Sequence, residues 1–260
     1  ILDAATFEEM LKIITEINPE GKVKLVGDFQ GGWTLPGLYV VGYVDNYGYD
    51  LVDGALSSEM DNRTGETLVE LMNDCDTDEG NKCLNNYYHH NGTEAARVFA
   101  IGSATSFIGF SERMFDILTY NRSLSSGGVY ISSAKFGTIS SSNNSLMWVD
   151  GLVLNANRSD EQSRQDAIIF SKYINDPSTR EWIALSLDAG TGTPPRYLMP
   201  ATQLFYELPK VKNDPYYPQF KAVIEGARPF PNENFTEIRE EKYTQVCNYI
   251  KDEIPSTTCD

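Results

Sequence analysis

Two acidic residues that each follow an aromatic residue by two positions are the strongest candidates for chemistry in this sequence. Glu112 lies in the run FIGFSERMF, two positions after Phe110, and Asp150 lies two positions after Trp148. An acid among aromatic rings loses part of its hydration, which raises its pKa toward the range where a carboxylate acts as a general base near neutral pH. Aromatic rings also suit a flat ligand, and a second acid suits hydrogen bonds from its amino groups.

Further aromatic residues precede these motifs and allow a second interpretation. They are Trp33, Tyr39, Tyr43, Tyr47, Tyr49 and Phe107. All of these rings could instead belong to a protein core, with Ser111 capping a helix and Glu112 favoured in its first turn by the helix dipole. The residue pattern leaves both interpretations open.

Two other motifs are incomplete. The run GFSER places Arg113 where a G-x-S-x-G nucleophile elbow needs Gly, which disfavours a serine hydrolase. The acidic run DCDTDEGN resembles a calcium loop, yet Glu79 takes the required Gly position and Asn85 that of the bidentate Glu. A solvated acidic loop explains this run better than a metal site.

Zinc and phosphate sites also find little support. His89 and His90 are adjacent, so their side chains diverge, and no CxxC or HExxH motif lies nearby. The run GDFQGG has neither the lysine nor the spacing of a phosphate-binding loop. We therefore expect no metal and no cofactor.

The composition indicates a folded protein with an acidic surface. Of the 260 residues 41% are hydrophobic, which suffices for a substantial core. The formal net charge of −16 argues against a nucleic-acid partner, because phosphate backbones are bound by an excess of Lys and Arg. Neither a membrane-spanning run of roughly 20 apolar residues nor a signal-peptide pattern is present, so we expect a processed chain without membrane insertion.

Cysteines and glycosylation motifs favour the secretory route. The cysteines fall into two close pairs, Cys75 with Cys83 and Cys247 with Cys259, and we favour adjacent pairing among the three connectivities that four cysteines allow. Six Asn-x-Ser/Thr sequons occur, where about three would arise by chance. They are at Asn62, Asn91, Asn121, Asn143, Asn157 and Asn234. We expect a secreted glycoprotein rather than a cytosolic protein.

The first half of the chain mixes helix and strand patterns. Apolar spacing behind Thr6 predicts a helix over 6–17, and alternation predicts a strand over 22–29. Residues 35–50 fit either a strand or a buried helix. The run TGETLVELMNDC predicts a short helix, RVFAIG a buried strand and SERMFDILTY a helix.

The second half becomes mainly helical. GVYISSAKF and LMWVDGLVLN are typical of strands, whereas residues 160–187 predict two helices broken at Pro177. A last amphipathic helix is predicted over 237–253. These elements indicate an α/β fold in one unit, 1–260, with a mixed core and pocket over 1–155 and a mainly helical part over 156–260.

The C-terminal half resembles the tail of type 2 extracellular solute-binding proteins. The resemblance depends on the segments GTGTPPRYLMPA and PYYPQFKAVIEGARPFPN after a long helical region. Within that superfamily, FSE followed about forty residues later by WVD resembles thiaminase I, in which aromatic residues precede a catalytic Glu and an Asp. The resemblance implies a two-lobed α/β fold that lacks much of its N-terminal lobe in this chain.

The resemblance also implies roles for the residues of the two motifs. In thiaminase I a cysteine attacks the thiamine pyrimidine and displaces the thiazole, after which an amine or thiol takes the pyrimidine. Glu112 would activate that cysteine, Asp150 would hold the aminopyrimidine, and Phe110 and Trp148 would line the ring pocket. In this chain both aromatic residues stand where the family has tyrosines.

A nucleophilic cysteine is missing from the matching region of this chain. Cys75 has an acidic setting that would raise a thiol pKa, and Cys83 is a ready disulfide partner. Base exchange would therefore need an N-terminal part, in the form of a companion chain, that carries the cysteine. The alternative is a non-catalytic glycoprotein that binds a small molecule or forms part of an extracellular assembly.

Overall fold

The fold is mixed and rich in helices, with few strands. The computed structural model describes residues 4–18, 22–27, 29, 31–75, 78, 83, 93–137, 145–149, 153, 155, 160–186 and 192–255. The elements, in chain order, are α1 (Phe7–Glu16), β1 (Val23–Gly27), α2 (Thr34–Tyr47), η1 (Tyr49–Leu56), α3 (Asn62–Asp74), α5 (Thr93–Ala100), β2 (Ala104–Ile108), α6 (Arg113–Tyr120), η2 (Arg122–Ser126), β3 (Leu146–Met147), α7 (Glu161–Asn175), α8 (Pro177–Ala184), α9 (Gln203–Tyr206), α10 (Pro209–Lys212), α11 (Tyr217–Ile224), β4 (Arg228–Pro229) and α12 (Asn232–Glu253). The α/β prediction is therefore correct in the coarse sense of a mixed fold.

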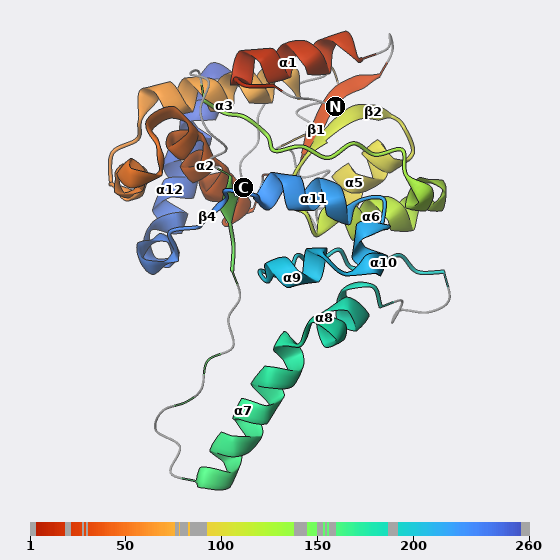
Figure 1. Cartoon of the computed structure of the whole chain (residues 1–260). Coiled ribbons are helices and arrows are strands. Elements are labelled where there is room, and N and C mark those ends of the chain that lie inside the picture. The colour runs from red at the N-terminus through yellow and green to blue at the C-terminus, as the bar shows by residue number, and fades with distance from the viewer. Residues whose placement is uncertain are drawn as a thin grey trace.

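The strands form two small parallel pairs. In β1 and β2, Val23 lies opposite Ala104 and Gly27 lies opposite Ile108 (Figure 1). Because the strands are parallel, the chain leaves both of them at the same edge of the sheet. The second pair joins β3 to β4, with Met147 opposite Pro229.

The two N-terminal helices follow from local sequence rules. The hydroxyl of Thr6 accepts a hydrogen bond from the Glu9 N–H at 3.2 Å, so α1 begins where the sequence predicts. The ambiguous segment 35–50 forms most of α2, whose buried residues lie on every side of the helix. A helix that is apolar all round belongs in a core, which explains why its pattern resembles a buried strand.

The larger core joins segments that are distant in the sequence. Helix α12 packs against α2 and α3, and its Phe235, Val246 and Ile250 are fully buried. Lys242 of the same helix is only 2% exposed, and its ammonium group donates hydrogen bonds to the carbonyl oxygens of Ser57 at 2.8 Å and Glu59 at 3.3 Å. Burial lowers the pKa of Lys242, and the two carbonyls compensate part of its lost hydration.

A second core is dominated by tyrosines. We use the name tyrosine cluster for Tyr197, Phe205, Tyr206, Tyr216, Tyr217 and Phe220. Each of these side chains is at most 4% exposed. Most ring pairs are tilted or edge-on, as for Tyr197 and Tyr216, whose centroids lie 5.7 Å apart.

Of three strand predictions in the middle of the chain, two fail and the third is confirmed only in part. The run RVFAIG lies largely in α5, where Ala96 and Ala100 face the second core. Strand β2 begins only after it, at Ala104. The run GVYISSAKF pairs with no strand in the described part of the chain. In LMWVDGLVLN only Leu146 and Met147 form a strand among the described residues. A strand forms only where a second strand lies beside it and shares its backbone hydrogen bonds. The hydrophobic pattern of a segment does not show whether such a neighbour exists.

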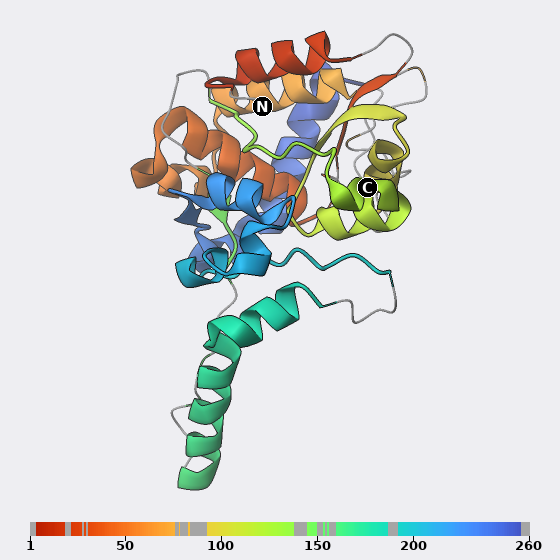
Figure 2. The ribbon, with the colours of Figure 1, turned by 45° about the vertical axis from the view of Figure 1, so that its right-hand side comes forward.

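Helices α7 and α8 form an arm that extends away from the body (Figures 1 and 2). The helix break falls at Pro177, as predicted. None of the fifteen residues of α7, all of which the structure describes, is buried. The arm is attached through α8, where Ala184 is buried in the second core and the Glu181 carboxylate lies 2.9 Å from the Lys210 ammonium.

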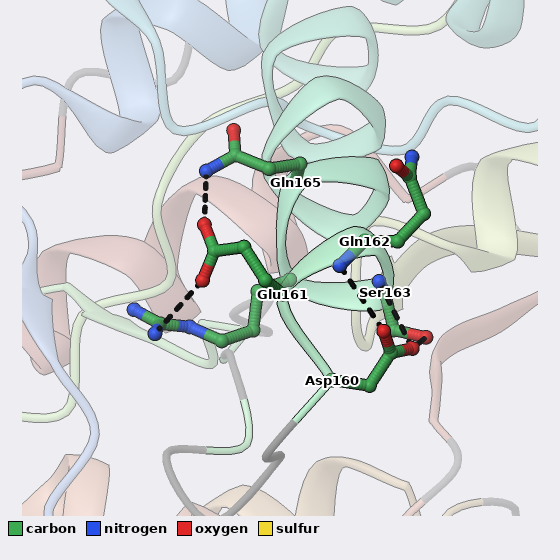
Figure 3. A network of polar contacts seen from close by, with 6 residues as sticks. Asp160, Glu161, Gln162, Ser163 and Gln165 are labelled. Atoms are coloured by element: carbon green, nitrogen blue, oxygen red, sulfur yellow. Dashed lines mark hydrogen bonds and ion pairs between the residues drawn. The ribbon is translucent and has the colours of Figure 1, made fainter.

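The start of α7 is stabilised by its own side chains. The Asp160 carboxylate accepts hydrogen bonds from the backbone N–H groups of Gln162 and Ser163 (Figure 3). The Ser163 hydroxyl also donates to this carboxylate and is the main cause of the lowered pKa of Asp160. Glu161 accepts from the Gln165 amide at 2.8 Å. Local capping therefore orders this helix where packing against the body does not.

Cys75 and Cys83 form a disulfide, in agreement with adjacent pairing. Their side chains are 0% and 1% exposed. Cys247 is also disulfide-bonded, and its predicted partner Cys259 lies outside the described residues. No described helix has the length and apolar character needed to cross a lipid bilayer.

Candidate functional site

The edge where β1 and β2 end positions the candidate site. In open sheets of parallel strands, ligands bind outside the carboxyl ends of the strands. The segment after β1 leads to Trp33, at the start of α2, and the segment after β2 leads to Phe110 and Glu112. Ile108, the last residue of β2, packs against the same core as Trp148. The segments that carry Trp33 and the FSE motif therefore leave the sheet at the same edge.

Four aromatic rings pack against one another around Trp148. We use the name aromatic platform for Trp33, Trp148, Phe230 and Phe235. Pairing of β3 with β4 places Trp148 against Phe230, whose rings stack with centroids 3.8 Å apart. Trp33 lies edge-on to Trp148 at 5.9 Å. Four separate segments of the chain therefore build one surface.

The platform is buried at its base and open at its top. Phe235 and Phe230 are 0% and 6% exposed, whereas Trp33 is 43% exposed and Trp148 is partly buried. Large exposed aromatic rings on a rigid apolar support bind flat ligands well, since little side-chain freedom is lost on binding.

A positive charge lies on the platform. The guanidinium carbon of Arg239 is 4.4 Å from the centre of the Trp33 ring, a cation–π contact. The Arg239 side chain is 23% exposed, and its Nη1 donates to the Gly32 carbonyl oxygen at 3.5 Å. Sequence reasoning missed Phe230, Phe235 and Arg239, because only the pairing of β3 with β4 and the packing of α12 bring them to Trp148.

Glu112 does not lie in an apolar setting. Its side chain is 61% exposed at the start of α6, and its nearest charged partner is the adjacent Arg113, at 3.7 Å. Phe107 packs instead on Phe99, with ring centroids 6.1 Å apart. The expected desolvation of Glu112 by its aromatic neighbours is therefore wrong in this structure, and its role as a base remains a prediction.

The other predicted site residues are only partly accounted for. Phe110 is partly buried and belongs to none of the ring pairs found in the described part of the platform. Asp150 lies outside the described residues. Trp148 lies beside Trp33, and its predicted role in lining a ring pocket stays a prediction.

The early tyrosines serve the fold around Asp61. The Asp61 N–H donates to the Tyr39 hydroxyl oxygen at 2.8 Å, and the Tyr47 hydroxyl donates to the Asp61 carboxylate at 2.9 Å. Burial raises the pKa of Tyr39 to about 12. Asp61 in turn accepts from the Thr64 N–H and caps α3. For these rings the core interpretation is the correct one.

Two hollows lie away from the platform. A cleft of about 450 Å³ is lined by Lys22, Ala104 and Thr105, at the opposite edge of the sheet where both strands begin. A smaller pocket of about 180 Å³ lies beside the tyrosine cluster, lined by Tyr206, Lys212 and Lys221. Among the described residues no group of acids, histidines and cysteines could hold a metal ion.

The sequons that the structure describes differ in accessibility. Asn62 and Asn234 are exposed at the first turns of α3 and α12. Asn121 is partly buried, and its amide donates to the Ala100 carbonyl oxygen at 2.8 Å. The other predicted sites, Asn91, Asn143 and Asn157, lie outside the described residues.

Comparison with known proteins bears on the fold. No family model matches the sequence, and no curated protein matches it. Among solved structures, the chain is similar to that of Clostridium botulinum thiaminase I in complex with thiamin, with a TM-score of 0.68 and 17% sequence identity. The match covers 97% of this chain and 67% of that chain. At this identity the similarity shows the fold alone, and the fold is thiaminase I-like.

Proposed function

We propose that this chain binds a flat, thiamine-like heteroaromatic molecule on the aromatic platform. The observation that carries the proposal is an exposed tryptophan, Trp33, supported by Trp148 and two buried phenylalanines. Stacking of a heteroaromatic ring on such a side chain contributes about 1–3 kcal/mol. The thiaminase I-like fold supports the same ligand class, because the similar structure was solved with thiamin.

The proposed roles of the motif residues follow the resemblance. Trp148 and Phe110 line the ring site, Asp150 holds the aminopyrimidine and Glu112 acts as the base. The open setting of Glu112 requires that another part of the protein cover it before its carboxylate is desolvated. We infer that this part belongs to the N-terminal lobe of a type 2 solute-binding fold, on a companion chain or another segment.

Base exchange also requires a thiol from that part. Glu112 would take the proton of the thiol, the thiolate would bond to the pyrimidine, and the thiazole would leave with the electrons of the broken bond. An incoming amine or thiol would then displace the enzyme sulfur. Every described cysteine is in a disulfide, so none of them supplies this thiol.

The disulfides favour a second candidate function. With Cys75 and Cys83 paired in the core, the described residues include an exposed aromatic surface but no free thiol. A secreted, glycosylated protein that binds a heteroaromatic without chemistry, or that serves an extracellular assembly, has these features. Mass spectrometry of the native material before and after deglycosylation tests the glycoprotein assignment.

Ligand binding is tested by tryptophan fluorescence. A Trp182→Phe background removes the tryptophan on α8, which is 70% exposed and lies outside the platform, and leaves Trp33 and Trp148 as reporters. We expect thiamine to quench this fluorescence in a saturable manner, and Trp33→Ala in the same background to weaken binding at least ten-fold. Equal affinity in Trp33→Ala, measured by equilibrium dialysis, would contradict the proposed site.

Catalysis is tested separately, with an N-terminal part supplied. A thiamine base-exchange assay is expected to show activity that Glu112→Gln abolishes, while Glu161→Gln, at another exposed first-turn acid, leaves it unchanged. Retained activity in Glu112→Gln would exclude this residue as the base.

A further inference from the structure

The electrostatic setting of the aromatic platform points to the charge of its ligand. Arg239 lies against Trp33, where a ring ligand would stack, and α12 fixes its backbone in the core through the fully buried Phe235 and Val246. The platform therefore carries a permanent positive charge, since an arginine does not lose its proton at any physiological pH.

The described residues neutralise this charge only weakly. Among them the carboxylate paired with Arg239 is that of Glu240, at 3.4 Å, and its side chain is 83% exposed. Water and salt screen an ion pair that is so exposed, so Glu240 offsets little of the charge of Arg239. The bond from Nη1 to the Gly32 carbonyl oxygen is long, at 3.5 Å. In the described structure Nε is buried and has no hydrogen-bond partner. Because Nε is buried, a ligand would meet the Nη1 and Nη2 edge, whose bonds to Gly32 and Glu240 are long at 3.5 and 3.4 Å, and this edge is suited to a planar anion.

On the premise of the proposed function, we infer that Arg239 selects heteroaromatic ligands that carry a carboxylate or phosphate group. The ring of such a ligand stacks on the platform, and its acid accepts hydrogen bonds from the outer edge of the guanidinium. A cationic ring without an acid, such as that of thiamine, still stacks but binds more weakly than its acid-bearing counterpart, because Arg239 lies against Trp33 and repels a second positive charge.

Two ligand pairs test the inference, each with and without an acid. Thiamine monophosphate is compared with thiamine, and orotate with uracil, by equilibrium dialysis at constant ionic strength. We expect the acid-bearing member of each pair to bind about ten-fold tighter, because its hydrogen bonds to Arg239 are charge-assisted. A preference in the first pair alone identifies phosphate as the favoured acid, and a preference in the second alone identifies carboxylate.

Variants of Arg239 locate the preference. For each ligand pair we compare the affinity of the acid-bearing member with that of the acid-free member. Arg239→Gln is expected to reduce both affinity ratios to about one. Arg239→Lys is expected to retain a smaller preference, because lysine keeps the charge without the planar guanidinium group. Arg228→Gln is the matched control. Its guanidinium carbon also lies over an aromatic ring, that of Tyr49 at 5.8 Å, but outside the platform, so the ratios should not change. Circular dichroism verifies folding of each variant.

The outcomes separate the two proposals. If thiamine binds the platform as tightly as thiamine monophosphate and uracil binds as tightly as orotate, the charge selectivity is overturned while the proposed function stands. Binding of none of the four ligands to the wild-type chain overturns both. An acid preference that survives Arg239→Gln overturns the assignment to Arg239.

Discussion

The aromatic platform and the tyrosine cluster contain similar rings but differ in what surrounds their polar groups. In the tyrosine cluster each hydroxyl lies inside the protein, and that of Tyr217 donates to the carbonyl oxygens of Ala184 and Leu198, both at 3.2 Å. On the platform Trp33 is 43% exposed and the polar neighbour, Arg239, lacks strong partners. The contrast shows that ring content alone does not distinguish a core from a candidate binding surface. The exposure of the rings does, since every ring of the tyrosine cluster is at most 4% exposed whereas Trp33 is 43% exposed.

The largest difference between the clusters should be in stability. Tyr217→Ala empties a fully buried site and is expected to lower the free energy of unfolding by about 3–5 kcal/mol. Trp33→Ala should cost much less, because the Trp33 side chain is already partly in water. Urea denaturation followed by circular dichroism measures both. Tyr130→Ala, at a side chain 75% exposed, is the control for a tyrosine without a core role, and equal losses in Tyr217→Ala and Trp33→Ala would contradict the distinction.

The disulfide should have an intermediate effect, confined to the core that supports the platform. Cys75 and Cys83 belong to the same core as Phe235, and they close a loop with a sequence separation of 8. Replacing both with Ala is expected to lower the free energy of unfolding by about 2–3 kcal/mol, because the unfolded chain gains freedom. Denaturant titration of the double variant measures the loss, and an unchanged midpoint would show that this loop does not constrain the unfolded chain.

The smallest effect compares two hydroxyls within the tyrosine cluster. Tyr206 is 4% exposed, and its hydroxyl has no hydrogen-bond partner in the described structure, whereas that of Tyr217 has two acceptors. Tyr206→Phe is expected to raise the free energy of unfolding by about 1 kcal/mol, and Tyr217→Phe to lower it by about the same amount. If both variants changed the free energy of unfolding in the same direction, the hydrogen-bond partners assigned to the two hydroxyls would be contradicted.

Alkaline pH should amplify the effect of Tyr206→Phe. Burial raises the pKa of Tyr206 to about 12 from an ordinary value of 10.0. Between these values the unfolded chain releases the proton more readily than the folded one, so stability is complete below pH 10 and falls toward pH 12. The stabilisation by Tyr206→Phe relative to the wild type should therefore increase over this range, as measured by urea titrations at pH 8 and pH 11. A constant difference would contradict the raised pKa.

Local signals made several helices predictable. Thr6 at the start of α1 and Pro177 at the start of α8 act through neighbouring residues, so the sequence contains all that is needed. The strand predicted over 22–29 is confirmed as β1, whereas strand predictions in the middle of the chain failed because a strand is defined by its partner. The segment ATSFI became β2 only because Val23–Gly27 lies beside it, and RVFAIG had no such neighbour.

The site was predictable only in part, for the same reason. The WVD motif predicted a ring site at Trp148, which stays a prediction, and the rings packed around Trp148 come from Trp33, Phe230 and Phe235, which only tertiary packing assembles. The exposure of Glu112 depends on Phe107 packing against Phe99 rather than beside the acid. Sequence neighbours of an acid on a helix start need not be its neighbours in space.

The exposed helix α7 should also determine where the chain is first cut by a protease. A helix of this length without buried residues is marginally stable in water, so it opens locally at much lower free energy than the two cores. Chymotrypsin cleaves after aromatic residues in opened segments, and Phe170 and Tyr173 on α7 are 56% and 58% exposed. Brief digestion should therefore nick the arm while both aromatic clusters remain folded, and the nicked chain would keep its platform.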